Sequence, residues 1–338
     1  MSELLISICI PSYNRPKEIR RLLDSIDCNT ETDFEIVICE DNAPKRNEVR
    51  AEVEDFTKKS QYKVRYIENE VNLGYDRNLK ALINAANGHF ILFMGDDDMF
   101  IPEQLDKYVA FLSEHQNCGY ILRSYRNVYA DGSMQYYRYF TEDKEFPASD
   151  ETYMNLFNKS VFISGFTMLR NAAKEFETDD FDGSLLYQLY LLAEVCRKYP
   201  SAYFNTPITQ SIEGGVPYFG SSESEKGLYT PGTVTIENSV NFMRWYIVIV
   251  DYISKKYGDH TNETMKLNMS KYSYPALSIQ RKRGRKIFYS YFIQLKNLGF
   301  GKSIYFYIYF VGLYCFGEKF CDSLIKGIKK LLGRRPNL

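Results

Sequence analysis

The first hundred residues alternate between strand-like runs and segments with the apolar spacing of a helix. Four runs have the pattern of strands, and most are almost continuously apolar, as in a sheet covered on both faces: 4–11, 34–40, 62–67 and 90–95. Three helical patterns separate them: 17–26, 45–59 and 78–86. This βαβαβαβ order predicts an α/β fold with a doubly wound, mostly parallel sheet and right-handed crossovers.

The rest of the chain has a mixed and then a helical pattern. We expect a strand over 119–125, a hairpin around 130–132 and a Gly/Ser-rich mobile loop over 214–227. Helices are predicted over four further segments: 102–114, 185–197, 234–256 and 263–280. We therefore expect one domain over 1–230, with a nucleotide-binding half (1–115) and an acceptor half (116–230). A helical appendage would follow over 231–338.

The charge is divided unevenly along the chain. The 338 residues carry a formal net charge of −1, but residues 281–338 hold thirteen Lys and Arg and only two acids. That segment therefore carries +11, which leaves −12 for the first 280 residues. An acidic body with a basic tail indicates a polyanionic or membrane partner.

Polar residues follow three of the predicted strands, at 11–15, 40–42 and 95–98. Ligands of open parallel sheets bind beyond the carboxyl ends of the strands, so these clusters predict one site. Asp96, Asp97 and Asp98 repel one another and are best stabilised by a cation, with Mg²⁺ or Mn²⁺ as the expected ion. The alternative is an exposed acidic turn before a helix.

The motifs together resemble the GT-A glycosyltransferases of family 2. The matching segments are SICIPSYNRPKEIRRLLDSI, EIVICEDNA and NLGYDRNLKALINAANGHFILFMGDDD, which cover about the first 115 residues. They correspond to the family's opening strand, its second-strand Asp, its N-x-G-x-x-x-N helix and its D-x-D. The motifs R-N-L and G-D-D-D further resemble those of bacterial O-antigen and capsule enzymes of the abequosyltransferase-like kind. The implied fold is GT-A, and the implied donor is a nucleotide-diphosphate sugar.

The resemblance also implies site residues. Pro11, Tyr13 and Arg15 would line the nucleotide pocket, with Tyr13 on the base and Asp41 bonded to it. Arg77 and Asn78 would lie near the ribose or the diphosphate, although packing or a surface ion pair would also explain Tyr13 and Arg77. Three aspartates would complete the donor and metal site. Asp96 would lie at the ribose and the metal, Asp98 would bind the metal, and Asp97 could take either role. Many members have Asp where this chain has Gly95, which leaves the D-x-D register open by one residue.

An inverting transferase needs a general base for the acceptor hydroxyl. In the family an acidic pair before a helix supplies it, and Asp180 and Asp182 are the candidates here, next to Glu177 and Asp179. Acids also stabilise a helix N-terminus without any catalytic role, and a retaining reaction would need no such base. Glu213 with the loop 214–220 is expected to form a lid that excludes water.

The basic tail predicts a peripheral contact with an anionic membrane through residues 281–338. RKRGRK at 281–286 precedes an uncharged aromatic segment of 13 residues at 304–316, which is too short to span a bilayer. Phe320, Leu324, Ile328 and Leu331 then recur at helical spacing among lysines. A transferase with a lipid-linked oligosaccharide acceptor, at the inner face of the plasma membrane, fits this pattern. A core role or a homo-oligomer contact for the aromatic segment stays open.

Several classes are disfavoured. Seven cysteines without a C-x-x-C pair and three scattered histidines predict reduced core thiols and no zinc site, in a cytoplasmic protein without a signal peptide. No P-loop, G-x-G-x-x-G or nucleic-acid-binding motif is present. A sugar-phosphate nucleotidyltransferase would need a Gly/Arg-rich N-terminal loop, which is missing. A non-catalytic membrane-associated scaffold is the third possibility.

Overall fold

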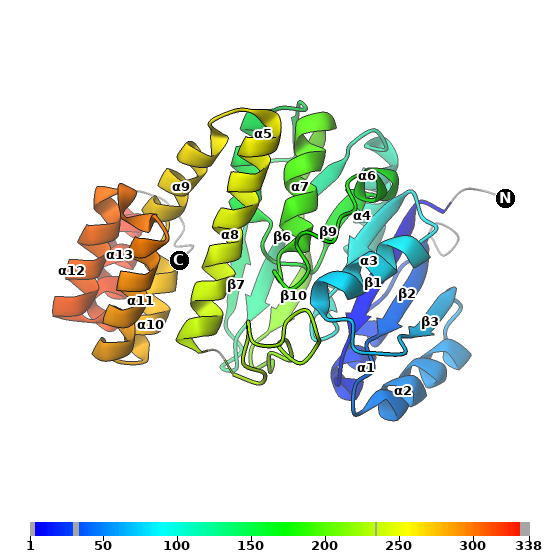
Figure 1. The fold of residues 1–338 in the computed structure, drawn as a ribbon. Coiled ribbons are helices and arrows are strands. Elements are labelled where there is room, and N and C mark those ends of the chain that lie inside the picture. The colour runs from blue at the N-terminus through cyan, green and yellow to red at the C-terminus, as the bar shows by residue number, and fades with distance from the viewer. Residues whose placement is uncertain (1–3, 30–33, 234, 332–338) are drawn as a thin grey trace. The chain divides into compact units, whose positions relative to one another are not determined.

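The structure is a computed structural model that describes residues 4–29, 34–233 and 235–331 (Figure 1). The side chains of Lys326 and of residues 328–331 lie outside the described set, so the predicted roles of Ile328 and Leu331 do too. The chain divides into two compact units. We call residues 1–233 the sheet unit and residues 234–338 the helical unit, and describe each by itself.

The described residues of the sheet unit form a ten-stranded sheet in the order β3-β2-β1-β4-β9-β6-β10-β5, with β7 on β6 and β8 on β10. The strands are β1 (Ile6–Ser12), β2 (Phe34–Glu40), β3 (Val64–Glu68), β4 (Phe90–Phe93), β5 (Met99–Phe100), β6 (Tyr120–Val128), β7 (Met134–Tyr137), β8 (Lys144–Phe146), β9 (Phe166–Leu169) and β10 (Ser201–Ile212). Strands β1 to β4 pair in parallel, as do β6 and β10, while β9 is antiparallel to both its neighbours. The predicted α/β class, with a mostly parallel central sheet, is confirmed.

The strand register brings the three polar clusters to one edge of this sheet. Ser12 pairs with Glu40 at the ends of β1 and β2, and Cys9 pairs with Phe93 at the end of β4. The chain then leaves each strand on the same side, because parallel strands share the direction of their carboxyl ends. Residues 13–15, 41–42 and 95–98 therefore emerge as neighbours.

Helices cover both faces of the sheet (Figure 1). On one face, apolar residues of α1 (Pro16–Asp24), α2 (Arg46–Lys59) and α4 (Leu105–Glu114) share a buried core with Ile6, Ile8 and Ile10 of β1. Alternate residues of a strand face opposite sides, so the other face needs its own cover. It is supplied by α3 (Tyr75–Ala85), α6 (Arg170–Glu175) and α7 (Tyr187–Lys198), with α5 (Asp150–Leu156) beside α7.

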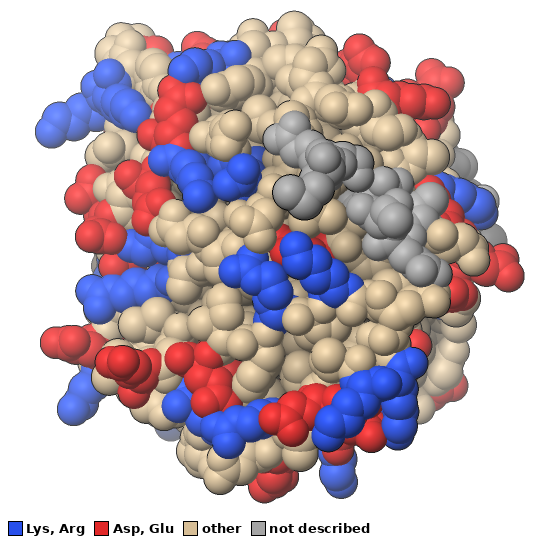
Figure 2. Space-filling view, turned by 90° about the vertical axis from the view of Figure 1, so that its right-hand side faces the viewer, with Lys and Arg blue, Asp and Glu red and all other residues tan. Residues whose placement is uncertain are grey.

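Charged side chains of both signs are interspersed on the face shown in Figure 2. In the sheet unit, Arg20 is paired with Asp24 and Asp55, and Lys59 with Asp55. In the part of that face that is described, the acidic excess of the first 280 residues is not gathered into one patch.

The helical unit contains α8 (Ile236–Tyr257), α9 (Thr261–Lys271), α10 (Tyr274–Lys282), α11 (Arg285–Asn297), α12 (Ile304–Phe316) and α13 (Glu318–Leu331). Its core is aromatic: the Phe292 ring lies 3.9 Å from that of Phe310 and 4.7 Å from that of Phe306. The predicted helical appendage is confirmed. Within the described residues, no helix combines the length and the apolar character that a membrane crossing requires.

One local prediction is wrong, and one long strand was not predicted. The single helix expected over 263–280 is wrong, because the chain breaks between Lys271 and Tyr274 and Pro275, which lacks an N–H, sits in the first turn of α10. The long strand β10 was not predicted. Its pairing with β6 shifts register around Pro207, and its polar residues hide the strand pattern.

Candidate active site

The loop after β1 binds the first aspartate of the triple sequence. The Tyr13 N–H donates to Asp96 Oδ2 at 3.0 Å, and Arg15 Nη1 donates to Asp96 Oδ1 at 2.7 Å. Asn14 has a left-handed φ of 63°, and Pro16 then begins α1, so the loop turns sharply here. Burial raises the pKa of Asp96 to about 6, although Arg15 opposes the shift. Tyr13, Arg15 and Asp96 thus form one cluster.

The third aspartate is buried against Ser164, which precedes β9. Ser164 Oγ donates to Asp98 Oδ2 and accepts the Gly95 N–H at 2.9 Å. Asp98 is only 6% exposed, and burial, with Asp97 and Asp96 nearby, raises its pKa to about 7. Ser164 therefore orients the carboxylate and fixes the start of the loop that carries all three acids.

Asp41 follows β2 and organises the turn before α3. It accepts the N–H groups of Leu73 at 2.8 Å and Gly74 at 2.9 Å, together with Asn69 Nδ2 at 2.9 Å. Asn78 joins the same network through Asn69 at 3.1 Å. Burial raises the pKa of Asp41 to about 6. In this structure both carboxylate oxygens bind the protein, and the predicted bond to a nucleotide base stays a prediction.

The segment after β10 packs onto these two clusters. Arg15 Nη2 donates to the carbonyl of Val216 at 2.6 Å, and the Tyr218 ring lies 5.9 Å from the Tyr13 ring. A Cβ at Gly215 would lie 2.7 Å from Asp97 Oδ2, so a larger residue here would have to move the Asp97 carboxylate. The irregular segment predicted over 214–227 is present and lies over the carboxylates.

Glu225 anchors the far end of that segment. Its side chain is buried and accepts the N–H of Tyr75 at 2.7 Å and of Gly220 at 2.6 Å. Gly74, at the start of α3, has a φ of 82°, and a Cβ there would overlap Ser222 Oγ. The start of α3 and residues 220–225 are therefore in direct contact. The exposed Glu213, predicted to belong to a lid, accepts the Ala130 N–H at 2.8 Å.

The candidate base residues lie beside α3. Asp182 is held between two cations, with Arg77 Nε and Lys80 Nζ each at 2.7 Å. Asp180 is exposed, whereas the side chain of Asp182 is only 9% exposed. Arg77, expected at the ribose or diphosphate, is thus joined in this structure to a predicted base.

One model of a known protein family matches residues 7–176, half of the chain, and its description is glycosyl transferase family 2. The chain belongs to glycosyl transferase family 2. The family 2 resemblance stated from the motifs is therefore confirmed.

Curated relatives of the family 2 region include bacterial transferases. An uncharacterized glycosyltransferase of Haemophilus influenzae is 31% identical, over 35% of this chain and 37% of that one. Abequosyltransferase RfbV of Salmonella typhimurium is 32% identical, over 30% and 31%. An Escherichia coli protein, UDP-Glc:alpha-D-GlcNAc-diphosphoundecaprenol beta-1,3-glucosyltransferase WfgD, is 26% identical, over 38% and 48%. The chain spans a third to a half of the length of these relatives.

Solved structures with the same fold include residues 1–349 of Staphylococcus aureus TarS in complex with UDP-GlcNAc. The TM-score is 0.53 and the sequence identity 19%, over 73% of this chain and 66% of that one. The likeness confirms the GT-A fold expected for a family 2 chain.

The acidic loop of this family 2 chain has the donor chemistry of a divalent-cation site. A Cβ at Gly95 would lie 3.3 Å from both Asp97 Oδ1 and Asp98 Oδ2, so these oxygens converge over the glycine. Hard cations prefer such carboxylates, and a bound cation would offset the burial that raises the pKa of Asp98. Asp96 is already bound by Arg15 and Tyr13. No three acidic, His or Cys side chains among the described residues surround a single point, and the metal roles of Asp96 and Asp98 stay predictions.

Three buried residues of the site were missed from the sequence: Ser164, Glu225 and Asp76. Asp76 accepts the N–H groups of Leu185 at 2.9 Å and Tyr187 at 3.1 Å, and thereby fixes the start of α7. Burial raises its pKa to about 7. The only sequence signal for Asp76 was its place in the N-x-G-x-x-x-N helix, beside Arg77 and Asn78.

Proposed function

We propose that the chain transfers a sugar from a nucleotide-diphosphate donor to a lipid-linked oligosaccharide in the synthesis of a bacterial surface polysaccharide. The carrying observation is the cluster of Arg15, Asp96, Asp97 and Asp98 at the carboxyl ends of the strands, in a family 2 chain. WfgD, whose name gives a diphosphoundecaprenol-linked sugar, supports the acceptor class, and TarS, which was solved with UDP-GlcNAc, supports the donor class.

Each residue of the site would have a separate role in the transfer. Asp97 and Asp98 would hold Mn²⁺ or Mg²⁺, which supplies positive charge for the departing diphosphate. Arg15 orients the acidic loop through its two ion pairs, and Tyr13 offers a ring for the base. The segment 213–225 keeps water away from the donor. For an inverting transfer, Asp182 or Asp180 accepts the proton of the acceptor hydroxyl.

A donor panel tests this function. UDP-, GDP-, dTDP- and CDP-sugars are incubated with the protein and Mn²⁺, and release of the nucleoside diphosphate is measured. We expect one nucleotide to be released and Asp98→Ala to reduce its release at least about a hundredfold. Glu114→Ala, at an exposed position on α4, serves as the matched control. Failure of every donor to bind or react would refute the proposal.

We also propose that the helical unit lies peripherally on an anionic membrane, at the cytoplasmic face. Six large apolar side chains of α12 and α13 are more than half exposed: Ile304, Ile308, Val311, Phe316, Phe320 and Leu324. Residues 281–338 carry +11, which complements anionic lipid.

Vesicle sedimentation tests the membrane proposal. We expect binding to vesicles of phosphatidylcholine with a quarter phosphatidylglycerol and loss of that binding in Ile308→Glu/Val311→Glu. Val248→Glu, at a 38% exposed position on α8, is the control and should leave binding unchanged. Equal binding of all three proteins would contradict the proposal. Deletion of 281–338 is a poorer test, because it would remove the aromatic core of the unit.

A further inference from the structure

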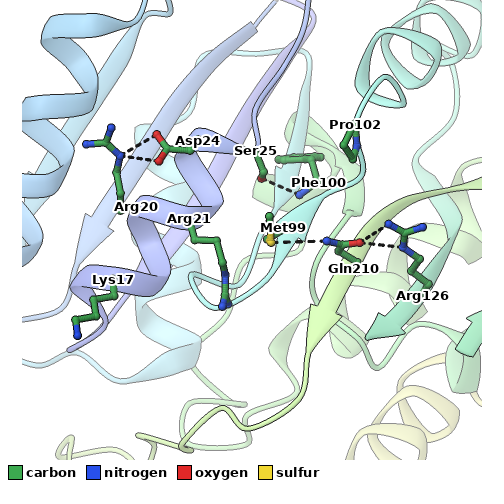
Figure 3. A pocket seen from close by; sticks show the side chains of 10 residues that line it. All are labelled: Lys17, Arg20, Arg21, Asp24, Ser25, Met99, Phe100, Pro102, Arg126 and Gln210. Carbon is green, nitrogen blue, oxygen red and sulfur yellow. Dashed lines mark hydrogen bonds and ion pairs between the residues drawn. The ribbon is translucent and has the colours of Figure 1, made fainter. Parts of the chain in front are cut away.

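A pocket of about 590 Å³ lies in the sheet unit (Figure 3). Its wall is formed by successive turns of α1, by the segment that follows the triple aspartate, and by β6 and β10. None of the residues predicted to bind donor or metal lines it. The lining side chains that matter here are Lys17, Arg20, Arg21, Met99, Arg126 and Gln210.

The pocket holds uncompensated positive charge. Arg20 is neutralised, since its guanidinium lies 2.8 Å from Asp24 and 2.6 Å from Asp55. Within the described parts of the chain, Lys17, Arg21 and Arg126 form no ion pair with any carboxylate. Three cations without counter-ions around one concavity attract an anion.

Arg126 is held in place by a neutral group. Arg126 Nε and Nη2 donate to Gln210 Oε1 at 2.9 and 2.6 Å, and Gln210 in turn lies against Met99 Sδ at 3.7 Å (Figure 3). Neutral acceptors orient the guanidinium and leave its full charge available. A planar guanidinium fixed in this way suits the oxygens of a phosphate.

Arg21 links the pocket to the acidic loop. One of its terminal nitrogens donates to the backbone carbonyl of Asp97, while its Nε is buried and has no partner in the described chain. A buried donor without an acceptor is unfavourable, and an anion oxygen would satisfy it. Arg21 therefore connects the pocket to the loop that carries the carboxylates of the candidate site.

We propose that this pocket binds the phosphate or diphosphate group of the lipid-linked acceptor. The inference rests on the proposed function for the identity of the acceptor. The unpaired cations supply the affinity for phosphate oxygens, and Met99, Phe100 and Pro102 supply an apolar wall for the first carbons of the lipid. An acceptor anchored here carries its sugar end toward the loop that holds Asp97.

The test measures binding by calorimetry to the full chain, without metal or donor. The probes are inorganic diphosphate and farnesyl diphosphate, a short soluble prenyl diphosphate. We expect farnesyl diphosphate to bind more tightly, and Lys17→Gln/Arg126→Gln to weaken its binding about tenfold or more. Lys58→Gln/Lys107→Gln is the matched control, because it removes the same amount of charge at two exposed lysines outside the pocket, and its affinity for the probe should stay within about twofold of wild type. Circular dichroism and thermal unfolding confirm that each variant is folded.

Each other outcome overturns the inference. Equal weakening in Lys58→Gln/Lys107→Gln would indicate a general effect of charge. Displacement of the probe by UDP would place it in the donor site. Equal affinity for the two probes would indicate a site for free anion and not for a lipid. The calorimetry contains no donor. A failed donor panel with intact probe binding would therefore refute the proposed donor reaction alone. A donor that reacts, together with a probe that does not bind, would refute this pocket alone.

Discussion

The Arg15 guanidinium bridges two carboxylates of the acidic loop: it lies 2.7 Å from Asp96 Oδ1 and 3.1 Å from Asp97 Oδ2. The same side chain donates to the carbonyl of Val216. One residue thus connects the loop after β1, the acidic loop after β4 and the segment after β10.

We expect Arg15→Lys to lower kcat/KM for the donor about tenfold or more, because a lysine cannot bond two carboxylates and a carbonyl in one plane. Arg15→Ala should lower it further. The measurement is steady-state kinetics with the donor identified by the panel. Arg20→Lys, in α1 directly after the loop that holds Arg15, serves as the control. Unchanged kinetics in Arg15→Lys would show that the bridge does not position the site.

Ser164→Ala should weaken Mn²⁺ activation several-fold and lower the free energy of unfolding by about 1–3 kcal/mol. It leaves the Gly95 N–H unpaired and releases the Asp98 carboxylate. Ser160→Ala is the control, since that equally buried hydroxyl accepts from Tyr120 at 2.8 Å away from the acidic loop. It should lower stability without changing the Mn²⁺ dependence. A similar Mn²⁺ requirement in both variants would refute the role of Ser164.

Stability should fall as the pH rises from about 4 to 7, partly because of Asp76. In the unfolded chain this carboxyl ionises near pH 4, whereas burial raises its pKa to about 7 in the folded chain. Between these values the unfolded state loses its proton first and is favoured. Asp76→Asn cannot ionise, so its unfolding free energy should depend less on pH. Urea titrations at several pH values measure this, with the exposed Asp27→Asn as control. Parallel pH curves for wild type and Asp76→Asn would contradict the prediction.

Gly74→Ala should cost much more stability than Gly227→Ala. Both glycines have φ near 80°, so each alanine carries the strain of a left-handed residue, about 1–2 kcal/mol. Only at Gly74 would the added methyl also overlap Ser222, whereas a Cβ at Gly227 would meet nothing within 4 Å. Thermal unfolding and donor binding are measured for both variants. The loss in Gly227→Ala reports the backbone strain, and any further loss in Gly74→Ala reports the overlap. If the two lose equal stability, residues 220–225 do not pack on α3 in solution.

Local patterns were sufficient for the elements at the centre of the sheet unit. The strand predicted over 34–40 has those bounds in the structure, because seven consecutive buried residues leave few other conformations. The acidic triplet after β4 marked the candidate site for another local reason, since three charges closely follow an apolar strand.

The supporting residues could not be found in this way, because each acts across a long stretch of chain. Ser164 reaches Asp98 over 66 residues, and Glu225 reaches Tyr75 over 150. A serine before a glycine, or a glutamate in a serine-rich segment, is typical of any loop. Arg77 and Asp182 were each predicted in separate roles, and only the fold shows that they are paired.

The bond from Arg15 to Val216 spans 201 residues, and this has a consequence for biosynthesis. A nascent chain can pair β1, β2 and β4 once about a hundred residues have left the ribosome, because these strands are close in sequence. The cover over the acidic loop forms only after residue 225 has emerged. A ribosome-bound chain therefore lacks the cover over its acidic loop until the helical unit is being synthesised, so the proposed donor site is completed together with the segment proposed to meet the membrane.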